Sequence, residues 1–458
     1  MPESIEKVPN DNTHRLAGDK IFPLLIKFSL PATIGTVLNA TYNITDRIFI
    51  GRAIGEDGLA AATISFPMMM IIIAFGMMFG HGSCALISIR LGQGNKPEAE
   101  KILGQSFALF AILSVCFTFF GLIFIEPLLT LFGASPNILP LAVTYARVIL
   151  WGIFAHEISF GINSLIRGEG NIKASMVTMI LGAVLNMILD PIFLFVLDMG
   201  IRGAAIATVI SQIISASWVM YYYLSNKSFL RLQFKNIKIY PTLARQVIAT
   251  GCPPFLMNST ACITQAIIYN SLGHYGGDTE IAVMGVIFTL LMLTFMPMIG
   301  LNHGTQPIIG FNYGAKNYQR VRHTAILTLI ISTGICLLMY LVINLIPQLL
   351  FMPFSSNSDF INTGAAALRK FMLLMPMIGT IFVTTNYFQA IARPKISILL
   401  SMIRQVLILV PAVLIMPLFL GVNGIWYSGP ASDCGAFIAA VILISRELKR
   451  LKVLSEPE

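Results

Sequence analysis

Charged residues are scarce in this sequence. Asp, Glu, Lys and Arg together make up 11% of the 458 residues, whereas soluble proteins carry about 25%. Apolar residues make up 56%, and the mean hydropathy is +0.79. So few charges cannot cover a water-soluble surface, so lipid must surround most of the chain. This scarcity excludes the several soluble domains that the length would otherwise predict.

Motifs of soluble enzymes are lacking as well. No GxxxxGK[ST] phosphate-binding loop occurs, and His156-Glu157 is not followed by the second histidine of the HExxH zinc motif. The six cysteines lie inside apolar segments without CxxC spacing, which is typical of small buried side chains. The sequence therefore predicts that the protein is not an enzyme and has no resident cofactor.

Long apolar runs are what the sequence has instead. Twelve of them are close to the roughly 20 residues that a membrane-spanning helix needs. The first begins near Phe22, behind a polar start that is not expected to be a cleavable signal. The predicted helices are 22–50, 59–88, 102–125, 139–165, 173–197, 203–224, 243–272, 281–308, 322–346, 368–391, 396–419 and 424–445.

The two halves of the chain repeat each other at an offset of 220–222 residues. Pro31 corresponds to Pro253, and His81-Gly82 corresponds to His303-Gly304. Further pairs are 94–96 with 314–316, 170–175 with 392–397, and 200–203 with 421–424. Because each half has six crossings, the repeat is parallel, with its pseudo-twofold axis along the membrane normal. The sequence predicts an all-α polytopic membrane protein of two pseudo-symmetric six-helix bundles around a midplane cavity, as an alternating-access carrier requires.

Basic residues indicate the orientation. Of the 30 Lys and Arg residues, 24 lie on the side that holds both termini, and the positive-inside rule makes that side cytoplasmic. These residues do not form one patch, so the net charge of +9 does not predict a nucleic-acid partner. The predicted division is a cytoplasmic N-terminal tail (1–21), an N-lobe (22–225), a cytoplasmic linker (226–241), a C-lobe (242–446) and a cytoplasmic C-terminal tail (447–458).

Ionisable residues inside the predicted spans are functional candidates, because a charge in lipid is costly. Asp46 shares one face of the first helix with Asn39 and Asn43, at i, i+4 and i+7 spacing. Arg47 is adjacent in sequence but points about 100° around the helix. Asp46 therefore has no evident cationic partner.

The fifth and sixth helices carry two further polar faces. Asn186 and Asp190 are four residues apart, and Pro191 frees the carbonyl of Met187 from its helical hydrogen bond. Oxygen atoms from all three residues could then bind a cation or a water molecule. The sixth helix presents one polar stripe, made of Thr208, Ser211, Gln212 and Ser215.

Two interpretations of these polar groups remain open. They can bond one another and only fix the packing of the helices, which we favour for Asn43 and Gln212. A carboxyl group in a low-dielectric environment can instead load and release a proton or, when ionised, bind sodium. We favour this second interpretation for Asp46 and Asp190.

Other polar residues are weaker candidates for lining a cavity or binding substrate. His156 lies beside Glu157 in the fourth helix, and Asp433 corresponds to Gln212 in the repeat. Arg404 is expected to snorkel toward the membrane interface. The weaker candidates are Glu157, Asp433, Asn258 with Gln265 at i, i+7 spacing, and Thr385 with Gln389 at i, i+4 spacing.

Taken together, these features resemble a known family. The chain is similar to the multidrug and toxic compound extrusion (MATE) transporters over nearly its full length, and most of all to the DinF-type branch with its MepA-like multidrug exporters. Besides the twelve helices in two halves, the resemblance rests on the segments 43–51 (NITDRIFIG), 167–171 (RGEGN), 185–191 (LNMILDP), 203–208 (GAAIAT) and 306–315 (QPIIGFNYGA).

The resemblance implies export of cationic, amphipathic drugs and dyes from a V-shaped pair of lobes, in exchange for H⁺ or Na⁺. It implies cation coupling at Asp46, Asn186, Asp190 and Thr208, which would be metal ligands if the ion is Na⁺. The related NorM-type branch carries acidic residues in its seventh and tenth helices. Here those helices have no internal Asp or Glu, which favours coupling in the N-lobe.

The expected setting is the plasma membrane of a bacterium, with a monomer as the working unit. A lipid-linked saccharide flippase of the same wider superfamily is the main alternative, but its cavity would need several cationic residues, and the spans contain few. A receptor or scaffold without transport is a third possibility. The repeated halves and the carboxyl groups at the membrane midplane argue against it.

Overall fold

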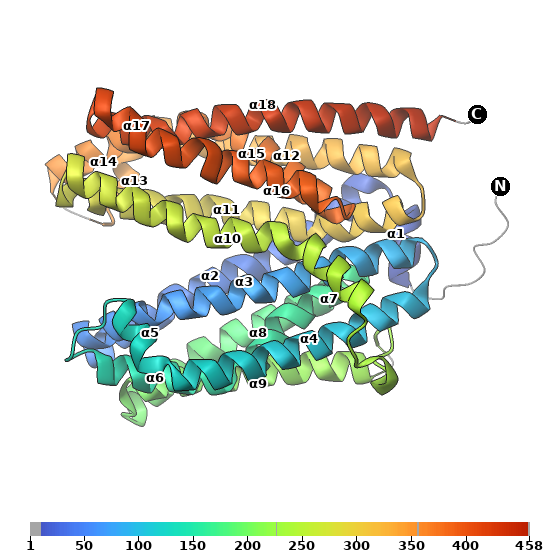
Figure 1. Ribbon diagram of the computed structural model, residues 1–458, viewed down its shortest axis with the longest axis horizontal. Helices are drawn as coiled ribbons and strands as arrows, with labels where there is room; N and C mark the ends of the chain where they lie inside the picture. Colours follow the sequence, from blue (N-terminus) through green and yellow to red (C-terminus); the bar gives the residue numbers. More distant parts are fainter. Residues whose placement is uncertain (1–10, 226, 355–356, 457–458) are drawn as a thin grey trace.

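The architecture is helical throughout the part of the chain that the structure, a computed structural model, describes: residues 11–225, 227–354 and 357–456. The first ten residues of the predicted N-terminal tail, the first residue of the predicted linker and the last two of the predicted C-terminal tail lie outside these residues. Most helices run along the long axis of the molecule, and both termini lie at the same end (Figure 1).

The first half of the molecule comprises α2 to α9 and is coloured blue to green in Figure 1. Short π-helices, η1 and η2, interrupt or extend two of its α-helices. With the preceding α1, its elements are α1 (Asp11–Gly18), α2 (Ile21–Ile54), α3 (Glu56–Gly92), α4 (Lys96–Ile123), α5 (Ile125–Leu131), α6 (Leu139–Glu157), η1 (Ile158–Ile162), α7 (Asn163–Gly168), α8 (Ile172–Pro191), η2 (Ile192–Val196) and α9 (Gly200–Leu224).

The second half comprises α10 to α18, coloured yellow-green to red. A 3₁₀ turn, η3, lies in the connection between the halves, and the π-helix η4 lies between α16 and α17. The elements are η3 (Phe234–Asn236), α10 (Pro241–Tyr275), α11 (Asp278–Gly314), α12 (Tyr318–Leu345), α13 (Pro347–Phe351), α14 (Ser358–Phe371), α15 (Met375–Ala390), α16 (Pro394–Met402), η4 (Ile403–Leu409), α17 (Val410–Leu420) and α18 (Val422–Ser455).

Length and hydropathy identify ten helices of the described residues as able to cross a membrane, or eleven if α14 and α15, bent by 51°, form one span. The remaining predicted span, 243–272, lies within α10. This 35-residue helix has a polar middle around Asn258 and Thr260, which lowers its hydropathy. It nevertheless runs beside α3, along the same axis as the other spans (Figure 1).

Left-handed turns repeat between the halves. Gly94 (φ +74°) and Lys316 (φ +58°) stand 222 positions apart, as do Gly170 (φ +89°) and Ala392 (φ +54°). The sequence-based pairing of Gly94 with Gly314 is therefore two residues out, because Gly94 occupies the same turn as Lys316. The halves share their backbone path even where their residues differ.

The two halves meet where α2 and α3 pack against α10 and α11. At two crossings a backbone carbonyl occupies the place of a side chain. A Cβ atom on Gly92 would lie 1.9 Å from the carbonyl oxygen of Phe311, and one on Gly314 would lie 2.1 Å from that of Ile89. Ordinary contacts begin at 3.4 Å, so glycine is what allows this approach. Both glycines end their helices, at the end of the molecule that holds the termini.

A second glycine crossing joins α3 to α10. A Cβ atom on Gly251 would lie 1.7 Å from the carbonyl oxygen of Met78, and one on Gly82 would lie 2.2 Å from that of Val247. Close by, the rings of the repeat-related His81 and His303 lie 5.5 Å apart.

Polar contacts accompany the glycine crossings. Gln306 of α11 donates to the His81 carbonyl (3.4 Å) and accepts from the thiol of Cys84 (3.6 Å). The halves are therefore closed against each other along this stretch.

Both predicted tails are more ordered than the sequence indicates. Helix α1 lies within the predicted N-terminal tail, and the Leu16 side chain is fully buried. Asn312 of α11 donates to the Leu16 carbonyl at 3.0 Å. Helix α18 continues to Ser455, so most of the segment predicted as a C-terminal tail is helical.

Candidate functional site

Three helices of the first half bring the predicted coupling residues together. Asp46 lies on α2, Asn186 and Asp190 on α8, and Thr208 on α9. The carboxyl groups of Asp46 and Asp190 lie within hydrogen-bonding reach of each other. The Nδ2 atom of Asn186 donates to Asp190 Oδ1 (3.1 Å) and to Thr208 Oγ1 (3.3 Å). These four residues form one connected group, called the carboxyl cluster below.

The local sequence of α8 positions half of this cluster. Asn186 and Asp190 are one helical turn apart, so they face the same side. Pro191 has no N–H to donate, and directly after it the backbone widens into the π-helix η2. Such π-helical segments frequently mark functional sites.

The carboxyl cluster retains unused acceptors. Asp46 Oδ1, Asp190 Oδ2 and Asn186 Oδ1 are buried without a hydrogen-bond partner. A hydrogen bond between two carboxyl groups requires a proton on one of them. When that proton leaves, the carboxylate oxygens, the amide oxygen and the Thr208 hydroxyl are hard donors of the kind that bind alkali and alkaline-earth cations. The geometry therefore fits either a proton or a sodium ion.

Two tyrosines adjoin the carboxyl cluster and were not predicted from the sequence. Tyr42 on α2 and the buried Tyr145 on α6 both interact electrostatically with its two carboxyl groups. Tyr42 precedes Asp46 by four residues, and this spacing was a usable signal. Tyr145 lies on another helix and gave none.

The other two polar residues of the predicted α2 stripe do not join the cluster. Asn43 is exposed and donates to the Asn39 carbonyl of its own helix at 2.8 Å.

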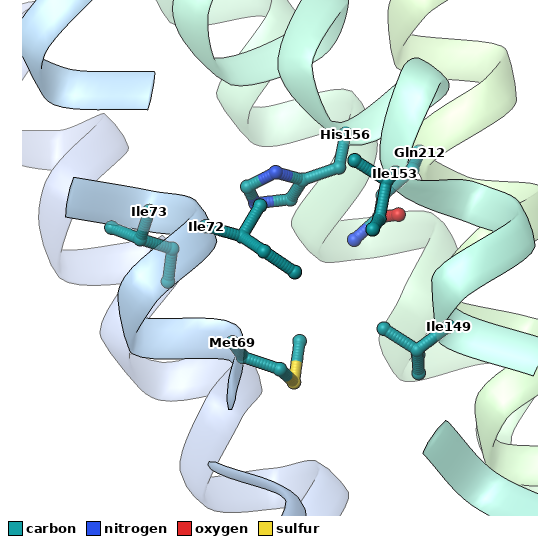
Figure 2. A pocket seen from close by; sticks show the side chains of 7 residues that line it. All are labelled: Met69, Ile72, Ile73, Ile149, Ile153, His156 and Gln212. Carbon is teal, nitrogen blue, oxygen red and sulfur yellow. The ribbon is translucent and has the colours of Figure 1, made fainter. Parts of the chain in front are cut away.

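An apolar pocket lies elsewhere in the first half, between α3, α6 and α9, with an empty volume of about 250 Å³ (Figure 2). Only two of the residues that line it are polar, and the His156 ring lies among the aliphatic side chains. Gln212 therefore faces a pocket instead of serving only helix packing. The lining residues are Met69, Ile72, Ile73, Ile149, Ile153, His156 and Gln212.

Glu157 is fully buried next to this pocket. Its exposed fraction is 0%, and neither carboxyl oxygen has a hydrogen-bond partner. Its Oε1 atom lies 3.7 Å from Nδ1 of His156.

The predicted snorkelling of Arg404 is wrong. Its Nε atom donates to Asp433 Oδ1 at 2.8 Å, which joins η4 to α18 by an ion pair inside the second half. Asp433 is only 3% exposed, so this predicted cavity residue has its charge compensated by Arg404. A buried carboxylate is the more favourable partner for the guanidinium because η4 carries Arg404 toward the bundle and away from either end of its span.

The polar residues predicted on α10 do not form one surface. Asn258 reaches across to the first half and donates to the sulfur of Met77 at 3.2 Å. Gln265 donates to the Tyr269 hydroxyl of its own helix at 3.3 Å.

The predicted pair on α15 also points away from open space. Thr385 donates to the Ile381 carbonyl one turn back, and Nε2 of the buried Gln389 has no partner. A pocket with an empty volume of about 210 Å³ between α11 and α15 is instead lined by Asn386, one residue further around the helix. The other lining residues are Asn302, Thr305, Gln306, Ile309, Val383, Tyr387 and Ala390.

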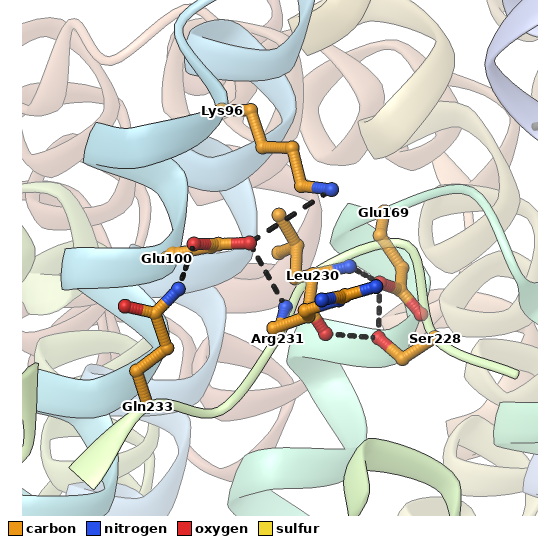
Figure 3. Close-up of polar contacts among 7 residues, drawn as sticks. All are labelled: Lys96, Glu100, Glu169, Ser228, Leu230, Arg231 and Gln233. Atoms are coloured by element: carbon orange, nitrogen blue, oxygen red, sulfur yellow. Dashed lines mark hydrogen bonds and ion pairs between the residues drawn. The ribbon is translucent and has the colours of Figure 1, made fainter. Parts of the chain in front are cut away.

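Two buried carboxyl groups fasten the predicted linker to the first half (Figure 3). Glu169, between α7 and α8, accepts hydrogen bonds from the Tyr222 hydroxyl, from Ser228 Oγ (2.9 Å) and from the Leu230 amide (3.3 Å). Burial raises the pKa of Glu169 to about 7, although these hydrogen bonds oppose the shift.

Glu100 of α4 holds the next turn of the linker. It accepts from the Arg231 amide (3.1 Å) and from Gln233 Nε2 (3.0 Å), with Lys96 Nζ 3.9 Å away. The linker is therefore a strap along the first half (Figure 3).

Two parallel helical halves with a carboxyl cluster between membrane-spanning helices define the class of transport proteins. The sequence profile of the MatE family matches residues 31–192 and again residues 253–414, and both limits of the second match lie 222 positions beyond those of the first. The chain belongs to the MatE family.

Curated relatives and solved structures agree with this assignment. Multidrug export protein MepA of Staphylococcus aureus is 26% identical over 436 residues, which covers 94% of this chain and 95% of that protein. MepA of Staphylococcus haemolyticus is 26% identical over 430 residues, covering 93% and 94%.

The structure of the MATE multidrug transporter DinF-BH in complex with a small-molecule ligand has a TM-score of 0.89 and 36% identity, covering 96% of this chain and 98% of that one. An outward-facing multidrug resistance MATE family transporter of the MOP superfamily has a TM-score of 0.90 and 26% identity, covering 97% and 99%.

Proposed function

We propose that this protein is a secondary antiporter that exports cationic, amphipathic drugs and dyes in exchange for H⁺ or Na⁺. The observation that carries the proposal is the contact between Asp46 and Asp190 inside the membrane-spanning part of a MatE-family chain. Two carboxyl groups that share a site bind a proton or a cation and release it when their surroundings change. The coupling ion is the only small ion or cofactor that this mechanism needs.

The energetics favour exchange over uniport. Export of one monovalent cation against about 100 mV costs roughly 2.3 kcal/mol. One entering H⁺ or Na⁺ cancels that electrical cost. Each pH unit across the membrane then supplies about 1.4 kcal/mol per proton, which drives a modest accumulation gradient.

The proposed setting is a bacterial plasma membrane, with both termini and the strap in the cytoplasm and one chain as the working unit. The distribution of 24 of the 30 basic residues supports this orientation. The glycine crossings would then close the cytoplasmic side, and the two halves would act as the moving lobes.

The flippase alternative is less favoured. A lipid-linked pyrophosphate would need unpaired cationic groups in the cavity, and the guanidinium of Arg404 is already engaged by Asp433. The curated relatives are described as multidrug exporters.

Dye efflux from proteoliposomes tests the proposal. A cationic rhodamine dye is loaded, and a proton gradient and a sodium gradient are imposed separately on wild type, Asp46→Asn and Asp190→Asn. One gradient should drive efflux, and both variants should lose it. Asp198→Asn is the matched control, because Asp198 is exposed and has a φ of +48° that asparagine also accepts. Efflux that neither gradient drives, with variants and wild type alike, would refute the antiport mechanism.

A further inference from the structure

We propose that His156 and Glu157 form a second proton-binding site in the first half, apart from the carboxyl cluster, and that an amphipathic cation in the adjoining pocket displaces its proton. This inference rests on the proposed export function, which it extends by giving the exchange a second proton.

The burial of Glu157 is the first argument. The side chain is 0% exposed and both oxygens lack a hydrogen-bond donor. An ionised carboxylate without donors or a paired cation costs several kcal/mol in such surroundings. Glu157 must therefore hold a proton itself or face a protonated His156, whose Nδ1 lies 3.7 Å away and is also unpartnered.

The space around the carboxyl group is made for it. A Cβ atom on Gly76 of α3 would lie 2.9 Å from Glu157 Oε2 and 3.3 Å from Oε1. Glycine at this position lets the carboxyl group pack directly against the backbone of α3. On the other side, the His156 ring stacks on Phe160 at 5.7 Å and 19°, which holds the imidazole beside the carboxyl group.

The pair has no other charged neighbour to fix its protonation. Of the described titratable groups, only His156 interacts electrostatically with Glu157. From the packed elements, α3 contributes Gly76 and apolar side chains, and α9 contributes the uncharged Gln212. Asp190 of α8 and Arg167 of α7 act elsewhere, on Asp46 and on His81. The charge at this site is therefore set by protons or by an incoming cation.

The pocket gives such a cation a place to bind. Its aliphatic walls suit the apolar body of an amphipathic ion, and His156 forms part of its lining (Figure 2). A cation there is compatible with an ionised Glu157 and a neutral His156. It is repelled by the imidazolium and gains nothing from a protonated carboxyl group. Proton and organic cation therefore compete for this site.

The backbone supports the same conclusion. The π-helix η1 begins at Ile158, directly after Glu157. The other two π-helices of the described residues lie directly after Asp190-Pro191 and around Arg404. Each π-helix thus accompanies a buried charged group, and η1 marks the His156–Glu157 pair as the counterpart of the carboxyl cluster.

Proton release on cation binding tests the proposal. The full chain in lipid nanodiscs is titrated with tetraphenylphosphonium by calorimetry, in buffers that differ in ionisation enthalpy and over a series of pH values. We expect wild type to release up to about two protons per cation bound, and Glu157→Gln to release about one fewer. The double variant Asp46→Asn, Asp190→Asn should keep the proton from Glu157. Glu126→Gln, on the exposed surface of α5, is the matched control.

The outcomes separate the two proposals. Equal proton release from Glu157→Gln and wild type would overturn the second site and leave the antiporter standing. No tetraphenylphosphonium binding by wild type would overturn both.

A readout on wild type avoids dependence on folding of the variants. Dicyclohexylcarbodiimide modifies protonated carboxyl groups in apolar surroundings. Peptide mass spectrometry should find Glu157 modified, less so at high pH and less so with tetraphenylphosphonium bound. An unmodified Glu157 at every pH would contradict the proposal.

Discussion

The glycine crossing between α3 and α10 predicts that one methyl group opens the interface between the halves. In Gly251→Ala the new Cβ would lie 1.7 Å from the Met78 carbonyl oxygen, whereas ordinary contact begins at 3.4 Å. The two backbones must therefore separate by about 1.7 Å. A gap of that size forfeits much of the local dispersion energy, and overpacking typically costs about 1–3 kcal/mol. The state closed at this interface loses that amount, which corresponds to a roughly 5- to 150-fold shift toward the open state.

Cys84 reports this shift. Its thiol is 0% exposed and contacts Gln306 across the interface. When opening and closing are fast, modification by N-ethylmaleimide follows the population of the open state. Peptide mass spectrometry should therefore show Cys84 labelled roughly 5- to 150-fold faster in Gly251→Ala than in wild type, by the coupling range above.

Two controls separate opening from unfolding. Gly334→Ala makes the same substitution within a helix, at a site with nothing within 4 Å of the new Cβ. Cys336, buried inside the second half next to Met298, should stay protected in both variants. Equal labelling of Cys84 in the two alanine variants would refute the reasoning, and labelling of Cys336 would indicate unfolding instead.

Two further predictions concern the strap and the second half. Because the pKa of Glu169 is raised from 4.5 to about 7, its contribution to stability is full below about pH 4.5 and is lost as the pH rises through 7. Glu169→Gln should flatten this decline, worth up to about 3 kcal/mol, in thermal melts across that range; an unchanged pH profile would contradict it. Arg404→Ala leaves Asp433 buried without its cation and should destabilise by about 3–5 kcal/mol, whereas the exposed Arg369→Ala should change thermal stability by less than about 0.5 kcal/mol. Equal melting of these two variants would exclude a structural role for the ion pair.

Features that depend on one helix could be predicted from the sequence. Apolar runs located all twelve helical segments, because length and hydropathy are local properties. Asn186 and Asp190 were placed on one face because their spacing fixes it. Their contact with Asp46 and Thr208 followed only as an expectation that the polar faces of neighbouring helices meet.

Features that depend on the rotation of one helix against another could not be predicted. Arg404 and Asp433 are 29 residues apart, and η4 shifts the helical period just where Arg404 lies. The contact of Glu100 with Arg231 spans 131 residues, and Tyr145 reaches the carboxyl cluster from a separate helix. A period of 3.6 residues loses its phase at each π-helix, so no pattern in the sequence carried these contacts.

The left-handed turns at Lys316 and Ala392 bear on the ancestry of the chain. A left-handed conformation costs a residue with a side chain roughly 1–2 kcal/mol, and the first half avoids this with Gly94 and Gly170 at the same turns. If both halves descend from one ancestral unit, the second has changed its residues and kept the bend. Selection has then acted on the course of the backbone more strictly than on the amino acids that suit it, so kinship between the halves is better preserved in shape than in composition.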